Sequence, residues 1–189
     1  MPIMQVYHVE DALDAAAKEQ LAQRLTDVLI AMEGGANTSA GRAFAWVLFS
    51  PVKAGDWWVG GRTDNHFVNP PGRFLVHVTV PEGYMNAQHK SEVHTWVNAT
   101  ITTVLGGAEE PNAGASVLVI IDEVAEGNWG AAGRTISLNA IAGSVGLPKD
   151  GDRFAWVQAY FAAKRRLFAA AGYPADIGGL MQAEATGSS

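Results

Sequence analysis

The chain has 189 residues, 48% of them apolar and 17% charged, which is enough apolar material for a packed core and excludes global disorder. Its formal net charge of -6 and the lack of a basic block argue against nucleic acid or an anionic membrane as a partner. Without cysteine, the chain can form no disulfide, thiolate nucleophile or cysteine-bound metal site.

The amino-terminal segment, MPIMQVYHVED, has neither the basic start nor the long apolar run of a secretory signal. No stretch of the sequence reaches the roughly 18 apolar residues that span a bilayer. We therefore expect a cytoplasmic protein that keeps its own amino terminus. Since methionine aminopeptidases remove Met readily before proline, we expect Pro2 to be the first residue of the mature chain.

The first predicted elements make one β-α-β unit. Ile3–Val9 is a short run of branched and aromatic residues and is predicted to be a strand. A helix is predicted over Asp14–Met32, because its apolar residues recur on one helical face, with Asp14 as its cap and Gly34 as its stop. The apolar run Ala43–Phe49 is predicted to be the second strand. Two strands joined through a helix should lie parallel.

The same order of elements returns 72 positions later, which indicates a duplication. Val119–Arg134 aligns without a gap with Val47–Arg62. Identical pairs in these segments are Val47/Val119, Val52/Val124, Gly55/Gly127, Trp57/Trp129, Gly61/Gly133 and Arg62/Arg134. Matches at the same offset recur nearer the amino terminus, so the chain is interpreted as two copies of one unit.

The second unit is predicted to contain the strand Phe74–Val80, the helix Asn86–Leu105 and the strand Ser116–Ile121. Two tandem β-α-β units side by side predict an α+β fold, in which a four-stranded sheet carries both helices on one face.

The predicted boundaries place the first unit at residues 1–72 and the second at 73–145. Residues 146–189 are predicted to form a C-terminal helix over Phe154–Ala170, followed by a tail of small polar residues. We expect all three parts to make one domain.

The Met-Pro start and the stretch Val119–Gly133 resemble 4-oxalocrotonate tautomerase, through an Ile-Ile-x-Glu core, the glycine after it and an aromatic residue at Trp129. The duplicated chain with a C-terminal helix is similar to the subfamily of cis-3-chloroacrylic acid dehalogenase. The resemblance covers about residues 2–145. It implies a cofactor-independent enzyme that acts on a small molecule through an amino-terminal proline and assembles as a trimer.

Several residues that the resemblance implies are missing. Members of the 4-oxalocrotonate type hold substrate carboxylates with two arginines, and the matching positions here are Ala12 or Tyr84 and Trp46 or Leu118. The side chains expected of the dehalogenases are replaced by Leu29, Pro81, Tyr84, Ile120 and Ala131. These replacements disfavour hydrolytic dehalogenation, and we expect a substrate less charged than a dicarboxylate.

Pro2 is the predicted catalytic residue. A free α-amine titrates near about 7.7–8.0 in water, and burial in an apolar pocket disfavours its ammonium form. A neutral amine with a pKa near the working pH is an efficient general base, which could move a proton beside a carbonyl and so isomerise keto and enol forms. The same amine could instead attack a carbonyl as a nucleophile, and the sequence does not choose between these two roles.

Four further residues are predicted to bind the substrate. Trp129 matches the family's active-site phenylalanine, and it either lines the pocket or packs its hairpin. Asn128 either donates a hydrogen bond to an enolate oxygen or favours the turn. Tyr84 would offer a neutral hydrogen bond in place of an arginine, and Arg73, just before the third strand, is a candidate for binding a carboxylate.

We expect no metal and no cofactor. His89 and His94 lie five positions apart rather than the four of a helical zinc pair, and the sequence has no glycine-rich phosphate-binding loop. Two other functions stay open. The first is another proline-dependent reaction on an unsaturated acid, such as hydration, decarboxylation or dehalogenation. The second is small-molecule binding on the same fold without chemistry.

Overall fold

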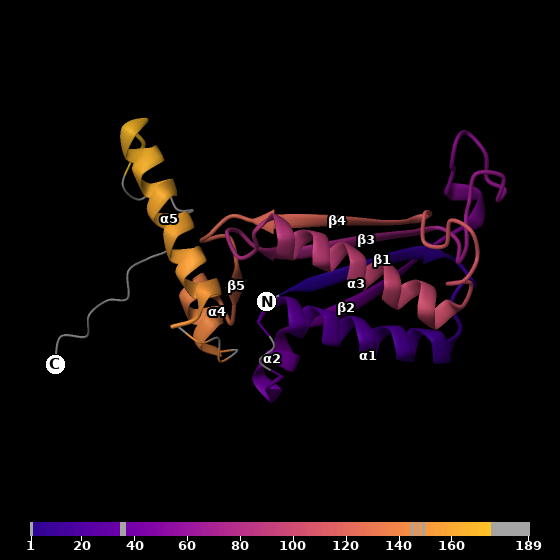
Figure 1. Ribbon diagram of the computed structural model, residues 1–189, viewed down its shortest axis with the longest axis horizontal. Coiled ribbons are helices and arrows are strands. Elements are labelled where there is room, and N and C mark those ends of the chain that lie inside the picture. The colour runs from indigo at the N-terminus through magenta and orange to yellow at the C-terminus, as the bar shows by residue number, and fades with distance from the viewer. Residues whose placement is uncertain (1, 35–36, 145, 147, 149, 175–189) are drawn as a thin grey trace.

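The computed structural model describes residues 2–34, 37–144, 146, 148 and 150–174. Its main sheet has the strand order β2-β1-β3-β4, with β1 parallel to β2, β3 parallel to β4, and β1 antiparallel to β3 (Figure 1). No helix within the described ranges is long and apolar enough to cross a membrane. The elements are, in chain order, β1 (Ile3–Val9), α1 (Ala15–Met32), α2 (Ser39–Phe44), β2 (Trp46–Val52), the 3-10 turn η1 (Ala54–Asp56), β3 (Phe74–Pro81), α3 (Ala87–Leu105), β4 (Val117–Val124), β5 (Gly130–Ala131), β6 (Arg134–Thr135), α4 (Leu138–Ser144) and α5 (Asp152–Ala170).

Two β-α-β units build this sheet, as the sequence predicts. Helices α1 and α3 begin at Ala15 and Ala87, which are 72 positions apart. The Asp14 carboxylate caps α1 by accepting a hydrogen bond from Ala17 N (2.7 Å), and Asn86 caps α3 in the same way. The predicted α+β fold is confirmed: each unit has parallel strands, both helices lie on one face of the sheet, and α5 follows as a C-terminal helix.

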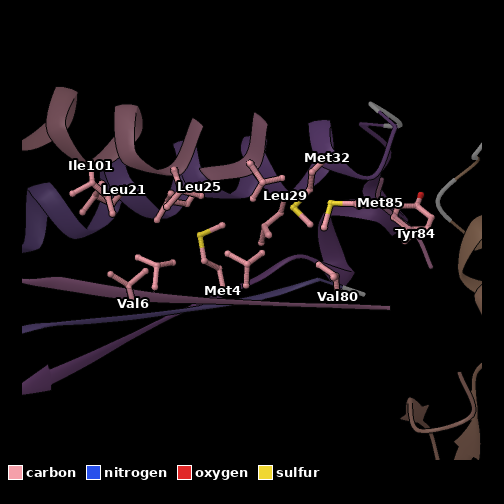
Figure 2. Close-up of a cluster of buried hydrophobic side chains, with 14 of the residues drawn as sticks. Met4, Val6, Leu21, Leu25, Leu29, Met32, Val80, Tyr84, Met85 and Ile101 are labelled. Carbon is pink, nitrogen blue, oxygen red and sulfur yellow. The ribbon is translucent and has the colours of Figure 1, made fainter. Parts of the chain in front are cut away.

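The core lies between the sheet and the pair of helices α1 and α3 (Figure 2). Met4 and Val6, alternate residues of β1, point to this side and are fully buried. Leu21, Leu25 and Leu29 on one face of α1 lie over them and are also fully buried. Each such side chain stabilises the fold by about 1.5–3 kcal/mol relative to an exposed one.

The second strand of the first unit starts later than the sequence predicts. Ala43 and Phe44 belong to α2, which begins after Thr38, whose hydroxyl accepts a hydrogen bond from Gly41 N (2.9 Å). The prediction of a strand from Ala43 was therefore wrong, because a capped helical turn takes its first residues. Pairing with β1 then extends β2 to Val52.

Other elements also end at different residues than the sequence predicts. The strand β4 runs to Val124, three residues beyond the predicted end at Ile121, because it pairs with β3 along its whole length. A short hairpin after β4 is formed by β5 and β6, whereas the matching segment of the first unit makes a single bridge between Val59 and Arg62. Helix α4 has no counterpart in the sequence prediction.

Helix α5 packs on the loop that follows β3. The Glu82 carboxylate at the start of this loop binds Lys164 Nζ (2.7 and 2.6 Å) and accepts a hydrogen bond from the Tyr160 hydroxyl (2.7 Å). Burial acts to raise the pKa of Glu82, but the hydrogen bonds from Lys164 and Tyr160 outweigh it and lower this pKa. The apolar side of α5 is buried through Phe154, Val157 and Phe161.

Gly83 sets how closely α5 can approach this loop. Its φ is +71°, and a Cβ atom at this position would lie 2.5 Å from Tyr160 Cδ1. We expect Gly83→Ala to lower the free energy of unfolding by about 2–5 kcal/mol, since it adds backbone strain to a clash with α5. Urea unfolding measures this loss, and limited proteolysis should show faster cleavage around α5.

Gly61→Ala is the matched control for this prediction. Gly61 has a φ of +78°, but a Cβ there would meet nothing within 4 Å. This variant should therefore lose only the free energy of backbone strain, about 1–2 kcal/mol. Equal losses of unfolding free energy in the two variants would contradict the expected clash between the added methyl group and Tyr160 of α5.

Candidate active site

One end of the sheet gathers the segments that carry most of the predicted site. Because β1 and β3 are antiparallel, Ile3 at the start of β1 lies beside Thr79 near the end of β3. Trp46, the first residue of β2, pairs with Ile3 on its other side, and β4 ends beside β3. We call this region, with the loops after β3 and β4, the Pro2 end of the sheet. Figure 1 shows that β1 starts on the side of the molecule where β5 and α4 lie.

Pro2 is buried immediately before β1. Its carbonyl oxygen accepts a hydrogen bond from Trp46 N (3.2 Å), which holds the start of β1 against β2. A free amine at a buried position loses hydration, and this loss disfavours the charged ammonium form. Burial of Pro2 is therefore the structural feature that bears on its predicted role as a base.

Tyr84 comes from the loop after β3 and is 2% exposed. Its hydroxyl donates a hydrogen bond to the Glu33 carbonyl oxygen (2.6 Å), which ties this loop to the end of α1. Figure 2 shows Tyr84 at one end of the buried cluster, near Met85 and Met32. Burial raises the pKa of the Tyr84 phenol, and the nearby charge of Glu33 adds to this effect, so the phenol stays protonated as a donor.

Glu33 is a buried carboxyl group at the Pro2 end that the sequence analysis did not single out. It is the C-terminal cap residue of α1 and is 5% exposed. Burial raises its pKa, while the positive charge of Arg153 acts in the opposite direction. A negative charge at a helix C-terminus interacts unfavourably with the helix dipole. This unfavourable position is the signal in the sequence that could have marked Glu33.

Arg153, in the first turn of α5, is the second residue that was missed. Its guanidinium carbon lies 5.2 Å from the centre of the Tyr84 ring, within the range of a cation–π interaction. A cation in the first turn of a helix also opposes the helix dipole. The dipole conflict could have marked Arg153, but its contact with Tyr84 depends on tertiary structure and is not visible in the sequence.

Trp129 and Asn128 lie in the loop between β4 and β5, at the same end of the sheet. Trp129 is buried, and its indole nitrogen has no hydrogen-bond partner among the described residues. Asn128 is exposed, and its backbone N–H donates to the Ala125 carbonyl (3.0 Å), as expected for a turn.

The loop that carries Trp129 is fixed at its base by a buried carboxylate. The backbone N–H of Leu138 donates to both oxygens of Glu126 (3.0 and 3.2 Å). Burial raises the pKa of Glu126, whereas this hydrogen bond acts to lower it. The contact joins the end of β4 to the start of α4 and so encloses the β5–β6 hairpin between them.

Arg73 lies at the opposite end of the sheet. It directly precedes Phe74, which pairs with His8 near the end of β1. Its guanidinium donates to the carbonyl oxygens of Trp57 (2.6 Å) and Thr63 (2.8 Å), and a third contact reaches the Asn65 side chain (3.1 Å). Within one chain, the structure therefore brings Pro2, Tyr84, Trp129 and Asn128 to one end, while Arg73 anchors the loop between β2 and β3.

Solved structures share this fold. Q0 fused 4-OT, a symmetric trimer, has a TM-score of 0.56 and 20% identity, over 74% of this chain and 98% of that chain. Pt0534 inactivated by 2-oxo-3-pentynoate gives the same four values. N1, a member of the cis-3-chloroacrylic acid dehalogenase family, has a TM-score of 0.56 and 19% identity, over 89% of this chain and 99% of that chain.

A search of curated proteins finds no match. A protein family does match, under the description putative oxalocrotonate tautomerase enzyme, and its match covers residues 1–136. This range includes both β-α-β units and ends at the β5–β6 hairpin, before α4 and α5. The resemblance read from the Met-Pro start and the repeat is thereby confirmed: the chain belongs to this family of putative oxalocrotonate tautomerases, within the tautomerase superfamily.

Proposed function

We propose that the chain is a cofactor-independent tautomerase in which Pro2, as the first residue of the mature protein, is the general base. The observation that carries this proposal is the burial of Pro2 at the end of the sheet that also holds Tyr84, Glu33 and Trp129. Membership of the tautomerase superfamily supports the reaction class. Burial supports the role of the amine, since it favours the neutral form that can accept a proton.

In this reaction, the neutral Pro2 nitrogen takes the hydroxyl proton of an enol. The resulting ammonium then gives a proton to the neighbouring carbon, so that the enol becomes a ketone and the base is regenerated. Negative charge develops on the enolate oxygen between these steps and is stabilised by a hydrogen-bond donor that is already in place. We assign this donor to the indole N–H of Trp129, which has no other partner among the described residues.

The first test is Pro2→Ala, with ketonisation of phenylenolpyruvate followed by absorbance. We expect the rate to fall by about 100-fold or more, as is usual when a general base is removed. The exposed proline Pro51 provides the control, and Pro51→Ala should keep the native rate. Mass spectrometry of the purified protein should show that Met1 has been removed. A retained Met1, or equal rates for native protein and Pro2→Ala, would contradict the assignment.

We also propose that the chain functions as a trimer, through the face of the sheet opposite α1 and α3. Alternate residues of the two outer strands expose large apolar side chains on this face, although patches of this kind are usually covered in soluble proteins. A fused 4-OT with the same fold is a trimer. The exposed residues are Trp46 (56%), Leu48 (44%), Leu118 (61%) and Ile120 (43%).

A charge on this face tests the proposed trimer. Leu48→Asp should release monomers of 20.0 kDa, because a carboxylate buried in an apolar interface loses its hydration. Light scattering after gel filtration should give three times that mass for the native protein. Leu167→Asp changes a leucine of α5 that is 66% exposed, and it should leave the trimer intact. A monomeric native protein would refute this proposal.

A further inference from the structure

A cavity of about 400 Å³ lies where the end of α1, the start of α3 and the start of α5 meet. Its position adjoins the Pro2 end of the sheet, because Gly34 in its wall directly follows Glu33. The family match ends at residue 136, so the wall supplied by α5 is an addition to the two β-α-β units. The described residues that line it are Gly34, Asn86, His89, Asp152, Arg153 and Trp156.

Arg153 gives this cavity its positive charge. Burial lowers the pKa of His89, and the nearby charge of Arg153 lowers it further, so this imidazole is neutral at neutral pH. Burial also lowers the pKa of the Arg153 guanidinium, but an arginine remains charged at neutral pH. Glu33 and Glu92 act on Arg153 through their charge, and Asp152 precedes it in the wall.

Among the residues that the structure describes, no carboxylate directly contacts the guanidinium of Arg153. No hydrogen bond or ion pair joins it to any residue in the described part of the chain, and its Nε atom is buried without a partner. A guanidinium presents its N–H groups as a planar fork, which matches the two oxygens of a carboxylate. Arg153 therefore has unused donors that suit a carboxylate ligand.

Tyr84 holds Arg153 in place. The Tyr84 ring is buried and fixed by the bond from its hydroxyl to the Glu33 carbonyl, so it forms a rigid surface on which the guanidinium stacks. Tyr84 also occupies a position where the resemblance to 4-oxalocrotonate tautomerase implies an arginine. The contact thus places a guanidinium from α5 beside the position at which this chain lacks the arginine that the resemblance implies.

We infer that Arg153 is a specificity-determining residue of this chain, and that it binds the single carboxylate of the substrate in the cavity between α1, α3 and α5. The inference rests on the proposed function, because it names the substrate class for the site of Pro2. With one cation in the described wall, the site selects an enol or keto acid with one carboxylate over a dicarboxylate. Helix α5 then does more than pack on the loop after β3, since it also supplies the anion-binding group.

The test combines binding with turnover. Calorimetric titration with phenylpyruvate, and with its methyl ester, would be run on native protein, Pro2→Ala, Arg153→Gln and Arg153→Lys. We expect Arg153→Gln to weaken binding of the acid by about 10-fold or more, as for a lost charge-assisted hydrogen bond, and to leave ester binding unchanged. Arg153→Lys should recover part of the affinity. Arg166→Gln, an exposed arginine on the same helix, is the matched control and should bind like the native protein.

Ketonisation by the same proteins separates the two claims. Loss of turnover in Pro2→Ala with normal binding of the acid supports Pro2 as base, whereas Arg153→Gln should raise KM for phenylenolpyruvate more than it lowers kcat. If the native protein shows no turnover but binds the acid through Arg153, the tautomerase proposal is refuted and the anion site is supported. The inference about Arg153 is overturned if the native protein binds no phenylpyruvate. It is also overturned if Arg153→Gln binds the acid as tightly as native, or weakens acid and ester equally.

Discussion

The antiparallel pairing of β1 with β3 is the constraint on which the arrangement of the molecule depends. It places the two β-α-β units side by side with their strands running in opposite directions. The start of β1 therefore lies beside the end of β3. Backbone hydrogen bonding fixes this register, and Ile3 opposite Thr79 follows from it. Pro2, the end of α1 and the loops after β3 and β4 are thereby brought to one end of the sheet by topology alone.

The two ends of the sheet differ because the chain continues after the repeat. The end that holds Arg73 is occupied by the loop between β2 and β3, which accepts the hydrogen bonds of that guanidinium. The Pro2 end receives α5, anchored through Glu82 to Lys164 and Tyr160. The two ends of the duplicated fold thus differ, since a single added helix breaks their equivalence.

Much of the fold could be predicted because repetition and capping are local signals. The 72-residue offset and the caps Asp14 and Asn86 located both helices, and alternating or apolar runs located the strands. The start of β2 was misplaced because the residues before Trp46, although apolar, form a capped helical turn.

The candidate site was harder to predict than the fold, because its polar groups come from distant segments. The choice of Tyr84 rested on resemblance, but its partner Arg153 lies outside the family-matched region, and only the docking of α5 brings the two together. Glu33 was missed for a similar reason, since the sequence records its unfavourable place at a helix end but not its burial. Arg73 was chosen for its place just before the third strand, but its three contacts in this chain are with the loop between β2 and β3.

The most direct measurement is a crystal structure of the protein after reaction with 2-oxo-3-pentynoate, the reagent that inactivated Pt0534. A free Pro2 nitrogen can add to the alkyne carbon of this acid without a leaving group. The account predicts that the adduct is bonded to the Pro2 nitrogen, with its carboxylate within ion-pair distance of the Arg153 guanidinium. Met1 still attached to an unreacted Pro2, or an adduct whose carboxylate lies away from α5, would contradict it.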